Sequence, residues 1–138
     1  DLEDFQERMS THQNNNLTKE IIEFSESSPL REVCGFIMYK DGTLFFEKMI
    51  NHSHNDDYFK VDPVSFLERS LSNELVAIFH THVDSEEYPS EYDIQNSKNC
   101  LYPFLIYSLE TKKFNLFDMP EFKGPENGVN MLREAIND

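Results

Sequence analysis

Two histidines one residue apart, in the stretch IFHTHVDSEEYPSEYD, are the residues best suited to carry chemistry. His80 and His82 end a nearly continuous apolar run, which is typical of a strand covered on both faces. Because residues i and i+2 of a strand point to the same side, both imidazoles project together from the strand end. Two imidazoles held in this way suit a divalent metal ion, zinc above all.

A third metal ligand is expected from Asp93, in the first turn of a helix that Ser90 caps. The loop VDSEEYP is long enough to fold the helix start back beside the strand end. Two histidines, one carboxylate and an open fourth position for water form a catalytic kind of zinc site, because structural zinc more often has four protein ligands. Each residue alone has a simpler explanation: a polar strand end, a charge favoured by the helix dipole, or a plain cap.

The combined pattern H-x-H-x(7)-S-x(2)-D after an apolar strand resembles the signature of the JAMM/MPN metallopeptidase family. The upstream glutamate of that family is matched by Glu32, in the E-x-x-G setting of REVCGFI. CGFI, YFKVDPVSFL and VAIFHTH resemble the bacterial and phage branch, in particular the N-terminal domain of phage tail assembly proteins of the K type. Val83 replaces the proline that often follows the second histidine, so we expect a different loop shape.

This resemblance implies one zinc ion per chain, bound by His80, His82 and Asp93. It implies hydrolysis of a peptide or isopeptide bond by a zinc-bound water, with Glu32 as general base and the Ser90 hydroxyl as donor to the oxyanion. The substrate would be a protein or peptide, either a ubiquitin-like tail or a phage tail component. The alternative is a non-catalytic MPN-type interaction scaffold, a class that typically loses one or more of these residues.

The remaining segments predict the elements that position these residues. Asp41-Gly42 indicates a hairpin turn between two apolar runs, and Asp62 and Pro63 predict the N-cap and first position of a helix. LTKEIIEFSES and NGVNMLREAI predict further helices, and PFLIYSL and KFNLFDM predict two strands around the turn ETK. The expected class is α+β, a central, mostly antiparallel sheet flanked by helices with MPN/JAMM-like layering, similar to cytidine deaminases.

At 138 residues the chain is most simply one domain, expected over 17–138 after a polar lead-in or linker at 1–16. Because it begins with Asp1 rather than Met, we expect a fragment or a processed form. The net charge of -14, from 26 acidic and 12 basic residues, argues against nucleic acid or an anionic membrane as partner. No signal peptide is visible, so we expect a cytoplasmic or virion-tail-associated protein.

Two other groups of reactive residues receive no catalytic role. Cys34 lies two residues from Glu32, but a buried small hydrophobe is the better interpretation, and with Cys100 it does not make a disulfide framework. His52 and His54 form a second H-x-H, in NHSHNDDY, which we interpret as a solvated loop because its flanks are polar.

Overall fold

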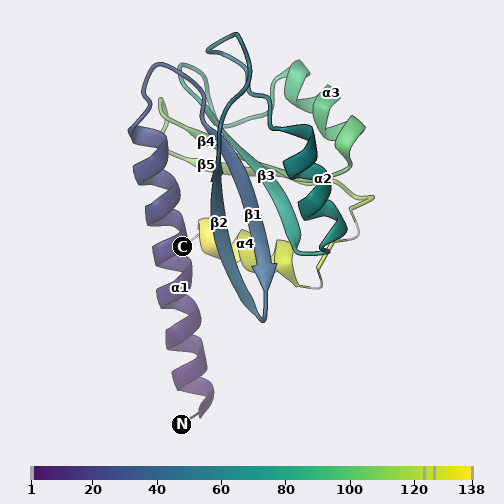
Figure 1. The fold of residues 1–138 in the computed structure, drawn as a ribbon. Coiled ribbons are helices and arrows are strands. Elements are labelled where there is room, and N and C mark those ends of the chain that lie inside the picture. Colours follow the sequence, from purple (N-terminus) through teal and green to yellow (C-terminus); the bar gives the residue numbers. More distant parts are fainter. Residues whose placement is uncertain (1, 123, 126, 138) are drawn as a thin grey trace.

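The computed structural model describes the backbone of residues 2–122, 124–125 and 127–137, and the side chains of these residues except 5–15. Within this part the chain forms helices and strands in a mixed order (Figure 1). They are α1 (Leu2–Glu26), β1 (Cys34–Lys40), β2 (Thr43–Met49), α2 (Pro63–Leu71), β3 (Leu75–His82), α3 (Glu91–Cys100), β4 (Phe104–Ser108), β5 (Phe114–Phe117) and α4 (Gly128–Asn137).

The strands form one sheet in the order β2-β1-β3-β4-β5. Each neighbouring pair is antiparallel except β3 and β4, which run parallel. The connection between that parallel pair passes through α3, as a parallel crossover usually requires a helix. The predicted α+β fold, with a central and mostly antiparallel sheet flanked by helices, is therefore confirmed.

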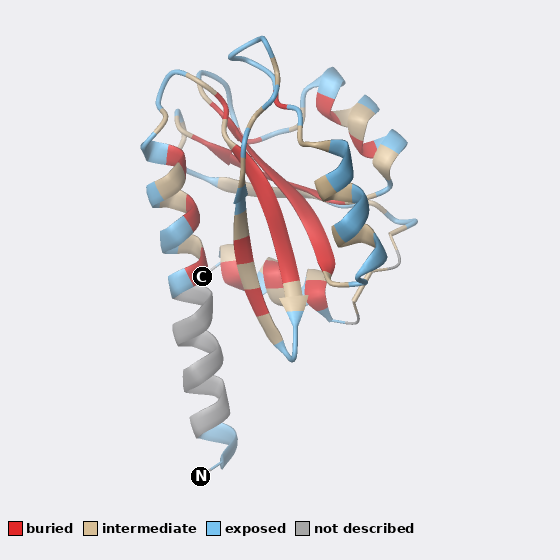
Figure 2. Ribbon diagram, in the orientation of Figure 1, coloured by how far each residue is buried: buried red, intermediate tan, exposed pale blue. Residues whose placement is uncertain are grey.

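Helices cover both faces of the sheet and enclose two hydrophobic cores. The core under α1 and α4 includes Ile21 and Leu132, and the core on the side of α2 and α3 includes Phe36 and Ile78. Between these two layers β3 is buried along its whole length (Figure 2). Each large apolar side chain that is fully buried contributes about 1.5–3 kcal/mol. The cores therefore hold the strand that carries both histidines rigidly in place.

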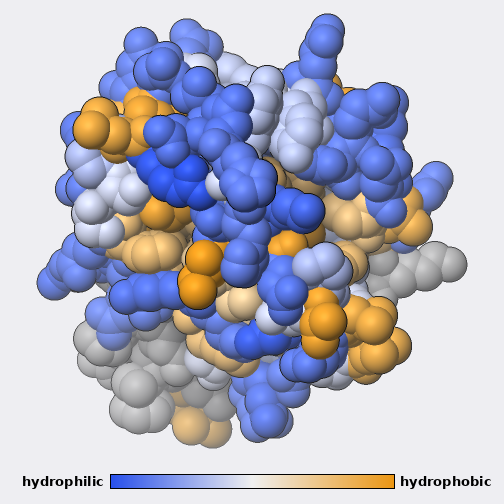
Figure 3. All heavy atoms as spheres, turned by 45° about the horizontal axis from the view of Figure 1, so that its top comes forward, coloured by the Kyte–Doolittle hydropathy of each residue, from blue (hydrophilic) through white to orange (hydrophobic). Residues whose placement is uncertain are grey.

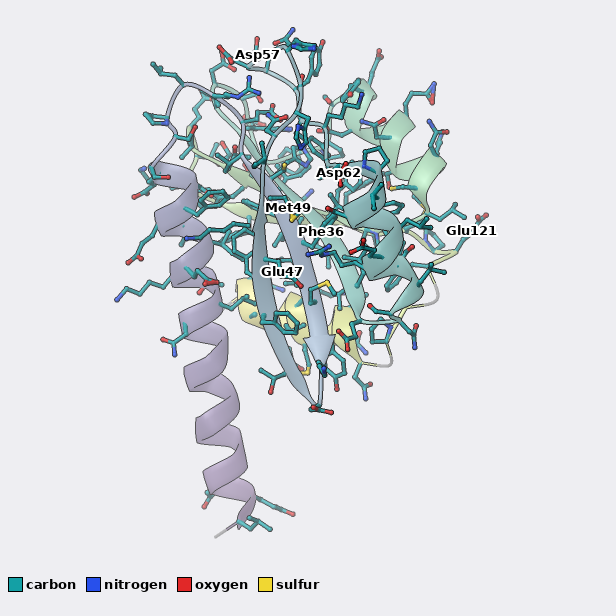
Figure 4. The ribbon with its side chains drawn as sticks, viewed as in Figure 1. Phe36, Glu47, Met49, Asp57, Asp62 and Glu121 are labelled. Atoms are coloured by element: carbon teal, nitrogen blue, oxygen red, sulfur yellow. The ribbon has the colours of Figure 1, made fainter. Side chains whose placement is uncertain are left out.

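Arg69 fixes α2 on its face of the sheet. The guanidinium lies over the Phe36 ring, 5.4 Å from the centroid, and donates to the Glu47 carboxylate at 2.7 and 3.2 Å. Phe36 and Glu47 are register partners on β1 and β2, and Figure 4 shows them beside α2. The N-terminus of α2 has Asp62 as its cap, accepting from the Ser65 amide at 3.1 Å, and Pro63 in its first turn, as predicted.

Glycine is needed at two places in the β1–β2 hairpin, the turn and the packing of the two strands. At the hairpin turn Asp41 and Gly42 both have positive φ, 52° and 79°, as a type I′ turn demands, so the predicted hairpin is confirmed. At Gly35, a Cβ atom would lie 2.5 Å from the Glu47 carbonyl oxygen and 2.5 Å from the Phe46 ring. The glycine of the E-x-x-G motif therefore lets β2 pack closely against β1, just after Glu32.

The backbone of the first residues differs from the expected loose lead-in. The helix predicted from Leu17 begins instead at Leu2 and runs without interruption to Glu26, and Figure 1 shows its N-terminal part extending beyond the sheet. A helix that is anchored by buried residues such as Ile21 can propagate through polar residues, because each added residue gains one backbone bond without a new nucleation step. Asp1 and the side chains of 5–15 lie outside the described residues.

The two later predictions of local structure are confirmed. β4 and β5 pair antiparallel around the turn that contains Lys112, which has a φ of 59°, and α4 covers the segment predicted as the last helix. Within the described residues, no helix combines the length and the hydrophobicity needed to cross a membrane.

Candidate metal centre

The C-terminal end of β3 presents both histidines on the side of the sheet that faces α2 and α3. Ile78, two residues before His80, belongs to the core on that side, whereas the intervening Phe79 belongs to the core under α1 and α4. Strand alternation therefore places His80 and His82 on the same face, as the sequence predicts. Their exposed fractions are 0% and 5%, so both rings are held by the surrounding protein.

The N-terminus of α3 brings Asp93 to the same place. Ser90 is the N-cap: its hydroxyl oxygen accepts from the Asp93 amide at 3.1 Å, and the Asp93 carboxylate accepts from the Ser90 amide at 3.0 Å. This reciprocal capping box fixes the backbone of the first turn and the direction of the Asp93 side chain. The cap predicted at Ser90 is confirmed, and it orients the carboxylate of the candidate ligand Asp93.

The three side chains meet in one compact group. His80 Nε2 lies 3.1 Å from Asp93 Oδ1, and His82 Nε2 lies 2.9 Å from Asp93 Oδ2. One ligand atom from each residue lies within 4.8 Å of the others. Donor atoms around a tetrahedral zinc ion are about 3.3–3.6 Å apart, for ligand bonds of about 2.0–2.2 Å. The group is therefore of the right size to hold one metal ion after small adjustments.

The surroundings of His80 suit a neutral metal ligand. Its ring stacks on Phe59 at a centroid distance of 4.2 Å and meets the edge of Phe104 at 5.5 Å. Burial lowers the pKa of the imidazole despite the nearby Asp93 carboxylate. Both ring nitrogens are buried without a hydrogen-bond partner among the described residues, although Nε2 is close to Asp93. Since buried polar atoms are normally satisfied, a metal ion at Nε2 would supply a missing partner.

His82 and Asp93 shift each other's pKa in opposite directions. Burial opposes protonation of His82, but its bonds to Asp93 and to the Glu86 carbonyl outweigh this and raise the pKa of its imidazole. For Asp93, burial favours the neutral acid, but the close approach of His80 and the bond with His82 hold the pKa of its carboxyl well below the usual range. Asp93 is therefore ionised, and its charge attracts a proton or a metal cation to this point.

The backbone next to Glu32 is tied to the strand that carries the histidines. Glu32 precedes β1 by two residues, and its neighbour Val33 exchanges bonds with Thr81: the Val33 amide donates to the Thr81 hydroxyl at 2.9 Å, and the Thr81 amide donates to the Val33 carbonyl at 3.0 Å. Thr81 lies between the two histidines. On the other side, the Glu32 carbonyl accepts from the Asn51 side chain at 2.9 Å.

The Glu32 carboxyl is buried among acidic neighbours. Burial, followed by repulsion from Asp93, Asp57 and Asp84, raises its pKa to about 9. Figure 4 shows Asp57 on the loop above this end of the sheet. Glu32 is not a member of the group whose ligand atoms converge. It lies within electrostatic reach of Asp93 without joining the ligands, as a proton acceptor beside a metal should.

The structure supports the assignments made for the other reactive residues. Cys34 is buried, its thiol donates to the Ile50 carbonyl at 3.7 Å, and burial raises the pKa of the thiol to about 12, so a thiolate nucleophile is excluded at neutral pH. His52 and His54 are both exposed on the loop before α2. Cys100 is a free thiol and makes no disulfide with Cys34.

Sequence reasoning missed two contacts that shape the centre. Phe59 stacks on His80. The sequence hints at this contact only through the aromatic pair Tyr58-Phe59, which interrupts the polar segment NHSHNDDYFK. The Glu86 carbonyl lies 2.6 Å from His82 Nδ1, and no side-chain pattern can reveal a backbone acceptor. The end of the molecule that carries the centre is largely hydrophilic, with separate hydrophobic areas (Figure 3).

Comparison with known proteins agrees with this fold. A solution structure of a protein from Desulfitobacterium hafniense superposes with a TM-score of 0.59, at 20% sequence identity, and the match covers 73% of this chain and 77% of that one. At that identity the likeness shows the fold alone. No protein of curated function matches the sequence. The family of prokaryotic homologs of the JAB domain matches residues 14–119, from within α1 to just beyond β5, and the chain belongs to that family.

Proposed function

We propose that this protein hydrolyses an amide bond, in a peptide or an isopeptide, with the help of one zinc ion bound by His80, His82 and Asp93. The observation that carries the proposal is the convergence of three ligand atoms within 4.8 Å around a buried His80 that lacks hydrogen-bond partners among the described residues. Two imidazoles and one carboxylate form a ligand set that zinc enzymes use when they keep a position open for substrate.

Zinc at this place would supply a Lewis acid for the scissile carbonyl and would lower the pKa of a water to roughly 7. The residues of the chain then have separate duties. His80 and His82 offer neutral imidazoles, and Asp93 offers the negative charge that partly balances the cation. The capping box with Ser90 keeps the Asp93 side chain from turning away. The rigid end of β3 limits the movement of the two rings.

Glu32 is proposed as the general base that takes a proton from the attacking water and later delivers it to the leaving amine. Its carboxyl is buried, and burial together with repulsion from Asp93 raises its pKa to about 9. A nearby divalent ion opposes that shift and returns the carboxylate toward the ionised form that accepts protons. Thr81 and Asn51 fix the backbone around Glu32, and Asp93 of the metal group lies near enough to raise the pKa of the Glu32 carboxyl.

Ser90 is proposed as the donor to the oxyanion of the tetrahedral intermediate. Its hydroxyl oxygen already accepts a bond from the Asp93 amide, which leaves the hydroxyl hydrogen free to turn toward the substrate. Removal of one oxyanion donor in another hydrolase reduces kcat by about 10²–10³-fold. Ser90 therefore combines a structural task with a chemical one.

The proposed substrate is a protein or peptide. Carboxylates surround the centre, among them Asp57 and Asp84, so an acidic segment next to the scissile bond would be repelled. A ubiquitin-like tail and a phage tail component remain the two proposed sources, the first for deconjugation and the second for tail assembly or entry.

Turnover by the zinc-loaded protein tests this proposal. Quenched fluorescent libraries would present linear peptide bonds in one set and lysine isopeptide bonds in another. Wild-type protein should cleave at least one set, a chelator should stop the cleavage, and added zinc should restore it. The Glu32→Gln protein, purified in the same way, controls for a contaminating protease. Zinc binding without cleavage in either set would instead favour a non-catalytic interaction scaffold.

A further inference from the structure

The loop between β3 and α3 is tied to the turn between β4 and β5 by two side-chain hydroxyls. The Ser108 hydroxyl donates to the Ser85 carbonyl at 2.6 Å. The Thr111 hydroxyl donates to the Glu87 carboxylate at 2.8 Å. The two anchored loop residues, Ser85 and Glu87, lie on either side of a single residue. The β4–β5 turn therefore fixes the loop at two closely spaced points.

The residue between these anchors is Glu86, whose carbonyl oxygen lies 2.6 Å from His82 Nδ1. A carbonyl can only accept, so this contact keeps a proton on Nδ1 and directs Nε2 toward Asp93. Histidines that bind metals usually have their second nitrogen held in this way, and the partner sets both the tautomer and the orientation of the ring. The position of the Glu86 carbonyl thus controls the orientation of the His82 imidazole.

Ser108 is built into the same end of the sheet as His82. The two are register partners on the parallel strands β3 and β4, and Ser108 is fully buried. Its hydroxyl oxygen also accepts from the Thr111 amide at 3.1 Å, so the two anchoring residues are coupled. The Leu109 amide donates to the His82 carbonyl at 2.9 Å. The end of β4 therefore holds the backbone of His82 as well as the loop that orients its ring.

Burial holds only part of this loop, because Glu87 is buried but residues 84–86 are exposed. Bonds from the Glu87 amide and, next, from the Thr111 hydroxyl lower the pKa of the Glu87 carboxyl, so this carboxylate is ionised at neutral pH. A hydrogen bond to an ionised acceptor is stronger than one between neutral groups, so the bond from Thr111 is stronger than the bond from Ser108 to a carbonyl. Without the two hydroxyls the Glu86 carbonyl would be free to move with an exposed segment. The imidazole would then lose the partner that fixes its orientation.

We infer that Ser108 and Thr111 are positioning residues for the metal ligand His82 and act through the carbonyl of Glu86. The inference rests on the proposed metal site and extends it to two residues outside the ligand and catalytic set. A loosened loop should weaken metal binding by roughly 10-fold or more, within the range of about 10–100-fold known for outer partners of metal ligands.

Metal affinity tests the inference without any substrate. Zinc dissociation constants would be measured by competition with a chromophoric chelator, and the absorption bands of bound Co²⁺ would report the ligand geometry. Thr111→Val removes the hydroxyl at nearly constant shape and leaves the Ser108 bond intact, so it is the milder variant. Thr111→Ser restores the hydroxyl, and Ser108→Ala removes the second anchor.

Ser25→Ala is the matched control for Ser108→Ala. Ser25 is also fully buried, and its hydroxyl donates to the Ile21 carbonyl at 2.7 Å, on the opposite face of the sheet. Melting temperatures of the metal-free proteins would show how much each change disturbs the fold. Ser25→Ala should lose stability but keep the zinc affinity and the Co²⁺ spectrum of the wild type.

Weaker zinc binding and shifted Co²⁺ bands in Thr111→Val and Ser108→Ala, with recovery in Thr111→Ser, would support the positioning role. Wild-type zinc affinity in both variants, at any stability, would overturn it while leaving the proposed function in place. A wild-type protein that binds no zinc would overturn this inference and the proposed function together.

Discussion

His82 Nε2 and Asp93 Oδ2 lie 2.9 Å apart, although the two residues are 11 positions apart in the sequence. Because the Glu86 carbonyl holds a proton on Nδ1, neutral His82 would turn a lone pair toward a carboxylate oxygen. Two acceptors this close need a cation between them. A proton can play that part, which explains the raised pKa of His82, and a divalent metal ion can replace it.

Exchange between protons and metal gives the first prediction. Because the pKa of the His82 imidazole is raised above its ordinary 6.5, protons compete with zinc at a higher pH than for an unperturbed histidine. Zinc affinity should be greatest above that raised pKa and should fall as the pH drops through it. Isothermal titration of zinc at a series of pH values would measure this, and an affinity independent of pH between 6 and 8 would contradict it.

The second prediction concerns Glu32→Gln. This change keeps the size and a hydrogen-bonding oxygen but removes the ability to take up a proton. Zinc content should stay near that of the wild type, because Glu32 lies outside the converging group. Hydrolysis should fall by roughly 10²–10⁴-fold, the range expected for lost general acid–base catalysis. Loss of zinc would make Glu32 a ligand, and full activity would assign the base to another residue.

The third prediction concerns the stability of the metal-free protein. The pKa of Glu32 rises on folding from 4.5 to about 9, so its contribution to stability is fully present below pH 4.5 and is lost as the pH rises toward 9. Glu32→Gln cannot ionise and should lack this loss. Urea denaturation of both proteins in chelator between pH 5 and 9 would show it. Parallel pH profiles would mean that the carboxyl is not buried as described.

Ser90→Ala, the fourth prediction, should weaken two functions at once. Loss of the cap should cost ~1 kcal/mol of folding stability, and loss of the oxyanion donor should lower kcat by more than that destabilisation explains. Asp62→Ala is the control, because Asp62 caps α2, not the helix that carries Asp93. It should lower stability and leave kcat unchanged. Equal kcat values in the two variants would mean that Ser90 acts only as a helix cap and not as an oxyanion donor.

The fifth prediction separates this centre from a cysteine peptidase. Cys34 lies two residues from Glu32, but its thiol is buried and has a pKa of about 12. Cys34→Ala should therefore retain turnover, and the Cys34 thiol of the native protein should resist iodoacetamide at neutral pH. Rapid alkylation of Cys34 with loss of activity would show that the thiol is reachable and needed.

The sequence predicts this centre well where local rules place the side chains. Strand alternation brings His80 and His82 together, and helix capping places Ser90 and Asp93. The Asp41-Gly42 turn likewise follows from the positive φ angles that those residues tolerate. Each of these features depends on residues close in sequence, and each is found in the structure.

The features that were missed depend on distant parts of the chain. Thr111 reaches Glu87 across 24 positions, and Phe59 meets His80 only when the loop before α2 folds over β3. No spacing rule encodes such contacts. The length of α1 was missed for a related reason: the polar residues after Leu2 have little pattern of their own, and they continue a helix whose buried part lies near Ile21.

Zinc content per chain tests the central claim most directly. Wild-type protein, reconstituted with zinc and freed of excess metal, would be compared by elemental analysis with His80→Ala and Asp93→Ala. We predict about one zinc ion per wild-type chain, because three ligands from a rigid strand and a capped helix leave a fourth position open, and loss of most of it in each variant. Absence of zinc from the wild type, or full zinc content in both variants, would contradict the assignment of this metal centre.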